Sequence, residues 1–173
     1  MKRRNLPPRD KDEVLTLYAH YFLVAELMLK NYKKQLTKWN QHGRLSQNDR
    51  VQLSIYFCTW LGFLGVTAEG FKKLAVRKLV QEARPPDFVD LIPLADGLGK
   101  LLKKHDDALR GFRNNVFHLR ESPDEIERFF RERPNRLEWA EELQAAFSQF
   151  FSNYRILCQV HYVIENRDEE LFK

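Results

Sequence analysis

A chain of 173 residues, 43% apolar and 31% charged, has the size and composition of one globular domain, which excludes a disordered or fibrous protein. Its 29 basic and 24 acidic residues give a net charge of +5, a modest excess that is compatible with a polyanionic partner without demonstrating one. The two cysteines, Cys58 and Cys158, lack metal-ligand spacing, so we expect free thiols in a reducing compartment.

The N-terminal end is basic and contains proline, but no apolar signal-peptide segment follows it. We interpret residues 1–10 as a basic tail and residues 11–173 as a single helical domain. The most apolar stretch, Val51–Ala68, has about the length of a membrane span, but it is interrupted by Gln, Ser and Thr. We therefore expect a buried helix, no contact with a membrane and a cytoplasmic location.

Helical periodicity runs through most of the chain, and no two-residue hairpin signal interrupts it. A first helix is predicted from about Lys11 to Trp39, ended by Gly43 in a left-handed cap. Ser46 should cap a second helix that continues to about Arg84, where Pro85-Pro86 stops it.

The second half of the chain predicts further helices. Asp87 should cap a third helix that ends at Leu102, and Asp106 or Asp107 should open a fourth that ends near Glu121. A short fifth segment over residues 122–132 precedes a last long helix, Arg136–Asn166. Long helices with short connections predict an all-α fold, an up-and-down antiparallel helical bundle.

The fourth predicted helix carries the polar residues that best fit a functional site. At ~100° per residue, one set of side chains faces the core, namely Leu109, Phe112, Val116 and Leu119. A polar set gathers on the opposite side, namely Arg110, Arg113, Asn114, His118 and Glu121. Phe117 lies on this polar arc, so we expect a partner subunit or a stacked base to cover it.

Arginine, asparagine and histidine together suit the cleavage of RNA. A histidine such as His118 can move protons near neutral pH, and a guanidinium such as Arg113 can hold and neutralise a phosphate. Asn114 lies four residues before His118, where its amide could orient the imidazole. This chemistry needs no metal and no cofactor, and the five histidines show no metal-ligand spacing. The alternative is a solvated helix face without a ligand.

The segment Arg113-Asn114-x-x-x-His118 resembles the R-x4–6-H motif of the HEPN superfamily, in which a polar residue commonly follows the arginine. The resemblance implies an all-α bundle, a homodimer and a metal-independent endoribonuclease of toxin–antitoxin, defence or RNA-processing systems, with an antitoxin protein as a further partner. It assigns the catalytic positions to Arg113, Asn114 and His118. Members paired with a nucleotidyltransferase often carry tyrosine two residues after the histidine, where this chain has Arg120.

Residues outside the motif could support it. An acidic residue of an earlier helix sometimes assists the motif in the family, and Glu69 is our candidate, with a structural salt bridge as the alternative. Arg110 and Phe117 are further supporting residues. Two groups of cations could contact an RNA backbone: Lys100, Lys103 and Lys104, just before the motif helix, and the stripe Lys72, Lys73, Arg77 and Lys78, for which a solvated helix end is the alternative.

Two other functions stay open for a chain of this kind. One is a non-catalytic helical module of the same fold that binds RNA, nucleotide or a protein. The other is a helical scaffold without a ligand. His161 and Glu165, four residues apart on the last helix, are interpreted as a surface pair without a catalytic role.

Overall fold

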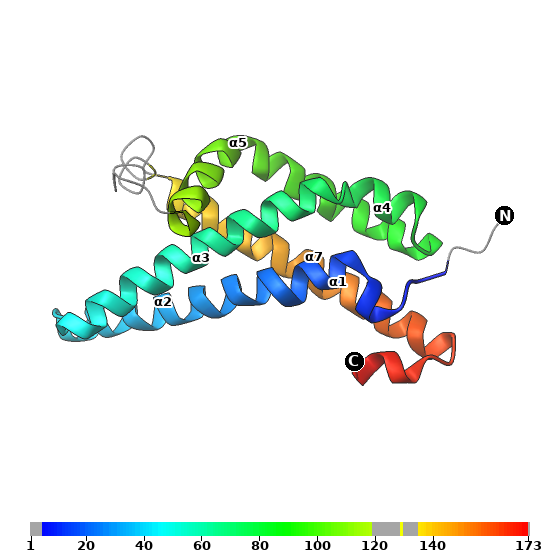
Figure 1. Cartoon of the computed structure of the whole chain (residues 1–173), viewed down its shortest axis with the longest axis horizontal. Helices are drawn as coiled ribbons and strands as arrows, with labels where there is room; N and C mark the ends of the chain where they lie inside the picture. Colours follow the sequence, from blue (N-terminus) through cyan, green and yellow to red (C-terminus); the bar gives the residue numbers. More distant parts are fainter. Residues whose placement is uncertain (1–4, 119–128, 130–134, 173) are drawn as a thin grey trace.

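The computed structural model describes residues 5–118, 129 and 135–172, which form an all-α helical bundle (Figure 1). No strand occurs in this part of the chain. The helices have the following bounds: α1 Glu13–Leu17, α2 Leu23–His42, α3 Gln47–Lys73, α4 Val76–Glu82, α5 Ile92–Phe117 and α7 Arg136–Ile164. The predicted fold class is therefore confirmed.

The predicted first helix is divided into two parts by a π-helical turn and extends to His42, and the predicted turn at Gly43 and Ser46 is confirmed. Asp12 caps α1, because its carboxylate accepts the backbone N–H groups of Val14 and Leu15 at 2.9 and 3.1 Å. A π-helical turn over Tyr18–Phe22 joins α1 to α2. Gly43 then takes the left-handed conformation (φ 66°), and the Ser46 hydroxyl accepts the Asp49 N–H at 3.1 Å to open α3. The turn brings α2 and α3 into an antiparallel hairpin (Figure 1).

The second helix is shorter than predicted. It ends at Lys73 rather than near Arg84, and a separate helix, α4, follows. The break lies at Ala75, which has left-handed backbone angles (φ 46°, ψ 51°). Neither glycine nor proline marks this position, so the apolar pattern continued through it without a stop signal.

The third and fourth predicted helices are joined in one long element. Asp87 does not cap α5 but lies in the first turn of a 3₁₀ helix, Pro86–Leu91, which has no side-chain cap. α5 then runs from Ile92 to Phe117 and bends at His105, whose backbone is not helical (φ −144°, ψ 25°). The predicted end at Glu121 and all but Phe129 of the predicted segment 122–132 lie outside the described residues.

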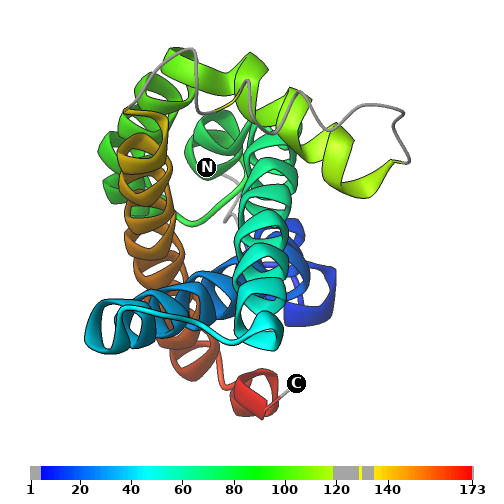
Figure 2. The same cartoon turned by 90° about the vertical axis from the view of Figure 1, so that its left-hand side faces the viewer.

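The core is aromatic and lies between the long helices. Figure 2 shows α3 and α7 facing each other, with α2 and α5 crossing at opposite ends of the view. Trp60 of α3 is fully buried and donates its indole N–H to Gln144 of α7 at 3.0 Å. Phe147 and Phe150 of α7 pack edge-on against Phe71 of α3, with ring centroids 5.4 and 5.3 Å apart. The last predicted helix is thus confirmed as a central element of the core.

α3 is the one described helix whose length and apolar content would allow it to cross a membrane. The same properties are typical of core helices in soluble proteins. Its residues Trp60, Leu61 and Leu64 are fully buried, and the helix packs against both α2 and α5. The predicted burial of Val51–Ala68 therefore holds for its second half, from Trp60 onward, whereas Val51 and Ile55 in its first half are more than half exposed.

A buried polar network ties both halves of the chain together. The Tyr154 hydroxyl of α7 donates to the Asp12 carboxylate at 2.8 Å and accepts from Arg84 Nε at 2.7 Å. Arg84 Nη2 also lies 3.4 Å from Asp12 and 3.2 Å from Glu13. Burial raises the pKa of the Tyr154 hydroxyl, so it stays a proton donor. The network fixes the start of α1 and the end of α4 against α7.

Candidate functional site

The motif helix α5 crosses α3 at two glycines. A Cβ atom added at Gly65 would lie 2.9 Å from the Arg113 Cβ, and one added at Gly62 would lie 3.0 Å from the Phe117 ring. Side chains larger than hydrogen would therefore push the two helices apart. These glycines do not kink α3, whose helix continues through them, but they allow α5 to approach closely.

Arg113 faces α3 and not the solvent. Its side chain is only 20% exposed, and its Nη2 atom lies 2.9 Å from Glu69 Oε2. Its Nε atom is buried and has no hydrogen-bond partner in the described part of the chain. The helical wheel was wrong to place Arg113 on an open polar arc, because α3 covers that side of α5. The wheel could not show this neighbour. Glu69, our candidate for supporting the motif, forms an ion pair with its arginine, which is also what the alternative of a structural salt bridge predicts.

His118 is the first residue beyond α5. Its backbone is extended (φ −124°, ψ 137°), although its N–H still donates to the Asn114 carbonyl at 3.0 Å. The imidazole is exposed, and within residues 5–118 no hydrogen bond joins it to the Asn114 amide. The expected four-residue side-chain pair requires helical geometry through position 118, and the helix ends one residue earlier.

Phe117 and Arg110 flank this end of the helix. Phe117 is 42% exposed, and its ring packs edge-on against Phe63 with the centroids 5.2 Å apart. α3 therefore supplies part of the cover that we had expected from a partner or a base. Arg110 is exposed and forms a 2.9 Å ion pair with Asp107 in the preceding turn.

A small surface pocket of about 150 Å³ lies between α3 and α5. Its charged lining residues are Glu69, Lys72, Asp106, Arg110 and Arg113. Lys72 forms an ion pair with Asp106, so each acidic group of the pocket has a cationic partner on the other helix. An anion that reached Arg113 would compete with Glu69 for the guanidinium.

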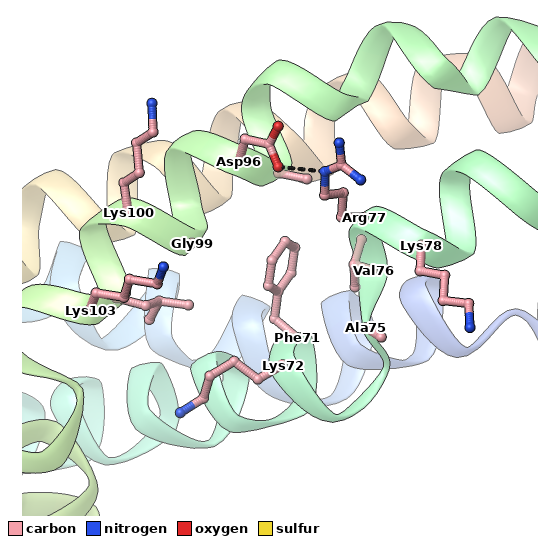
Figure 3. Close-up of a pocket in the computed structure, with 12 residues that line it drawn as sticks. Phe71, Lys72, Ala75, Val76, Arg77, Lys78, Asp96, Gly99, Lys100 and Lys103 are labelled. Atoms are coloured by element: carbon pink, nitrogen blue, oxygen red, sulfur yellow. Dashed lines mark hydrogen bonds and ion pairs between the residues drawn. The ribbon is translucent and has the colours of Figure 1, made fainter.

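A larger groove of about 490 Å³ lies next to this pocket, between α4 and the first half of α5 (Figure 3). Of the three lysines predicted to contact an RNA backbone, Lys100 and Lys103 line the groove from α5, but Lys104 does not. Arg77 and Lys78 line it from α4. Two basic stripes that are separate in the sequence thus face each other across one groove.

The sequence did not indicate this convergence, because it depends on the turn at Ala75. The left-handed backbone there redirects the chain, and α4 then lies beside α5. Lys72 lines both the groove and the smaller pocket, whereas Lys73 of the same stripe lines neither. If α3 continued straight to Arg84, Arg77 and Lys78 would not face α5 across the groove.

The remaining predicted groups have structural partners. His161 contacts Asp87, with 2.8 Å between Nε2 and Oδ2, and not Glu165, which pairs with Arg167 at 3.1 Å. The expected surface pair of His161 and Glu165 was therefore wrong. Cys58 and Cys158 are free thiols, as predicted. In the part of the chain that the structure describes, no three histidine, cysteine or acidic side chains gather in a way that could hold a metal ion.

Comparisons of the chain with models of known protein families, with curated proteins and with solved structures found no match.

Proposed function

We propose that this protein is a metal-independent endoribonuclease whose active site lies where α5 crosses α3 and ends. The observation that carries the proposal is the pair Arg113 and His118 on one helix end. Arg113 is held by Glu69 beside a surface pocket, and His118 is exposed directly after the helix. The resemblance of this segment to the HEPN motif supports the same function.

In this mechanism the two side chains act on one phosphate in different roles. Arg113 binds the scissile phosphate and neutralises the charge that develops on its oxygens. His118 accepts the proton of the 2′-hydroxyl or donates a proton to the leaving 5′-oxygen. Attack of the 2′-oxygen on phosphorus breaks the bond to the 5′-oxygen and leaves a 2′,3′-cyclic phosphate. Asn114 lies on the same helix end and is the third candidate of the motif, but among the described residues its amide does not orient the His118 imidazole.

The biological setting belongs to the same proposal. The resemblance implies a cytoplasmic toxin or a defence or stress-response ribonuclease, restrained by an antitoxin protein. Uncontrolled cleavage of cellular RNA would harm the cell, which gives a reason for such a partner.

A two-fold homodimer is also part of the proposal. Closed two-fold dimers are the commonest assembly, and the remaining exposure of Phe117 leaves an aromatic surface at the end of the motif helix. We expect light scattering at micromolar concentration to give twice the chain mass of 20.7 kDa. Phe117→Glu should shift that mass toward one chain, whereas a wild-type mass of one chain would contradict the dimer.

A second candidate is an RNA-binding module that does not cleave. The ion pair between Glu69 and Arg113 favours it, because the guanidinium is already neutralised and its Nε atom is buried. The basic groove favours it as well, since it could bind RNA without any reaction. Only a measurement of RNA cleavage with turnover distinguishes the two functions.

The test is incubation of the purified protein with RNA in the presence of a chelator. The wild type should cut, and His118→Ala should lose about 10²–10⁴ in rate, the usual contribution of a positioned proton-transfer group. His42→Ala is the matched control, because His42 is also an exposed histidine at a helix end, on α2, and should leave the rate unchanged. Loss of cleavage on chelation, or full activity of His118→Ala, would overturn the proposed function.

A further inference from the structure

The groove between α4 and α5 concentrates positive charge. Five cationic side chains and one acidic side chain line it, namely Lys72, Arg77, Lys78, Lys100, Lys103 and Asp96. Three of the cations have acidic partners: Arg77 with Asp96, Lys72 with Asp106 and, at 3.9 Å, Lys78 with Glu82. Within the described residues, Lys100 and Lys103 form no ion pair and are exposed. The α5 wall therefore presents two uncompensated cations.

The shape of the groove indicates where its ligand would lie. Its floor is apolar, and the Phe71 ring stands between the two walls, but Phe71 is only 5% exposed (Figure 3). Lys100 and Lys72 point outward from the rim and away from this ring (Figure 3). Lysines that cover an apolar floor with their stems and hold their amines in solvent are suited to a ligand that crosses the mouth. A base or a nucleotide buried on the floor would find few donors there.

The groove leads to the motif. Lys72 lines both the groove and the pocket that contains Arg113. Ten residues separate Lys103 from Arg113, which corresponds to about 15 Å along the axis of α5, and the helix bends at His105 between them. That length exceeds the reach of a single phosphate group. A strand with several phosphates could contact the lysines at one end and the guanidinium at the other.

We propose that the groove is the path along which a single strand of RNA reaches the motif, with its phosphates on Lys100, Lys103 and Lys72 and the scissile phosphate at Arg113. This inference rests on the proposed function for the identity of the cleaved phosphate. The lysines make positional contacts and read no sequence, because they are directed at the backbone. When the strand is bound, Lys72 exchanges its partner Asp106 for a phosphate.

Binding can be tested apart from cleavage. The probe is a fluorescent 12-nucleotide RNA of mixed sequence, titrated in a chelator with protein that carries His118→Ala, so that no cleavage depletes it. Adding Lys100→Glu and Lys103→Glu should weaken binding at least about tenfold at 100 mM salt. The fall of log affinity with log salt should also become less steep, by about 1.4, since each phosphate contact on a single strand contributes about 0.7 to that slope. The matched control is Lys30→Glu with Lys34→Glu on α2. It alters the net charge by the same amount, but at exposed lysines away from the groove, so it should weaken RNA binding much less.

The outcomes separate the path from the reaction. Groove-dependent binding by a protein that never cleaves would support the path and reject the ribonuclease. Cleavage by the wild type with unchanged binding in the groove variant would reject the path alone. A wild-type groove that binds no RNA, or equal weakening by both double variants, would also overturn the path. Groove-dependent binding of ATP without binding of the strand would replace it with a mononucleotide site.

Discussion

Arg113 combines the properties of a structural residue and of a catalytic one. It is mostly buried, it packs against Gly65, and yet one guanidinium nitrogen pairs with a carboxylate at the edge of a pocket. The residue pattern identified the arginine and the histidine as candidates, and the family resemblance suggested Glu69 as an acidic residue that supports them. It could not show that α3 covers the arginine, because a helical wheel contains no neighbouring helix. It also could not show that the helix stops before His118, since the stretch from Asp107 to Glu121 keeps its apolar periodicity.

Glu69→Gln tests whether Glu69 positions Arg113. Glu69 is 54% exposed, so loss of the ion pair should lower the free energy of unfolding by less than about 1 kcal/mol. If the ion pair holds the guanidinium in place, kcat for RNA cleavage should fall roughly tenfold while KM changes little, because misplaced groups lose transition-state stabilisation. Kinetic assays and urea titrations check both values.

Glu141→Gln is the matched control for this prediction. Glu141 forms a 3.0 Å ion pair with Lys33 and is 41% exposed, so its loss should cost a similar amount of stability. It should leave kcat unchanged. Faster cleavage by Glu69→Gln would show that Glu69 competes with the substrate and does not position the arginine.

At the level of helices, periodicity and capping residues predicted the long elements and the interruption near His105, but they missed the break at Ala75. Some helix ends are set by local interactions: the side chains of Asp12 and Ser46 cap helix starts, and the left-handed backbone of Gly43 ends α2. The break at Ala75 carries no such local signal, whereas the bend at His105 lies between the predicted helix end at Leu102 and the predicted start at Asp106. Packing of α4 against α5 accompanies the break, and packing partners are not visible in one segment of sequence.

The close crossing of α3 and α5 predicts opposite effects for two Gly→Ala changes. Gly65→Ala should lower the free energy of unfolding by about 1–3 kcal/mol, because its Cβ would lie 2.9 Å from the Arg113 Cβ. Gly97→Ala in α5 meets no atom within 4 Å and should raise stability by about 0.5–1 kcal/mol through helix propensity. Urea denaturation of both variants measures the difference. Equal and small effects would contradict a crossing that depends on Gly65.

At the scale of the whole molecule, the bundle brings together groups that are distant in the sequence. α7 anchors the start of α1 and the end of α4 through Tyr154, and α4 then forms one wall of the basic groove. The sequence predicted the all-α class because long periodic segments dominate it. It could not predict the groove, because opposing walls are a property of the assembled fold. The same assembly places the groove next to the pocket of Arg113.

The most direct test of the account is the chemistry of the cleaved ends. A DNA oligonucleotide with one ribonucleotide should be cut in chelator only after that ribonucleotide, because attack needs its 2′-hydroxyl. The upstream product should carry a 2′,3′-cyclic phosphate, and the all-deoxy oligonucleotide should remain intact. Mass spectrometry of the products identifies the ends, with His118→Ala as the inactive control. Cutting of the all-deoxy strand, or an upstream product that ends in a free 3′-hydroxyl, would contradict the mechanism.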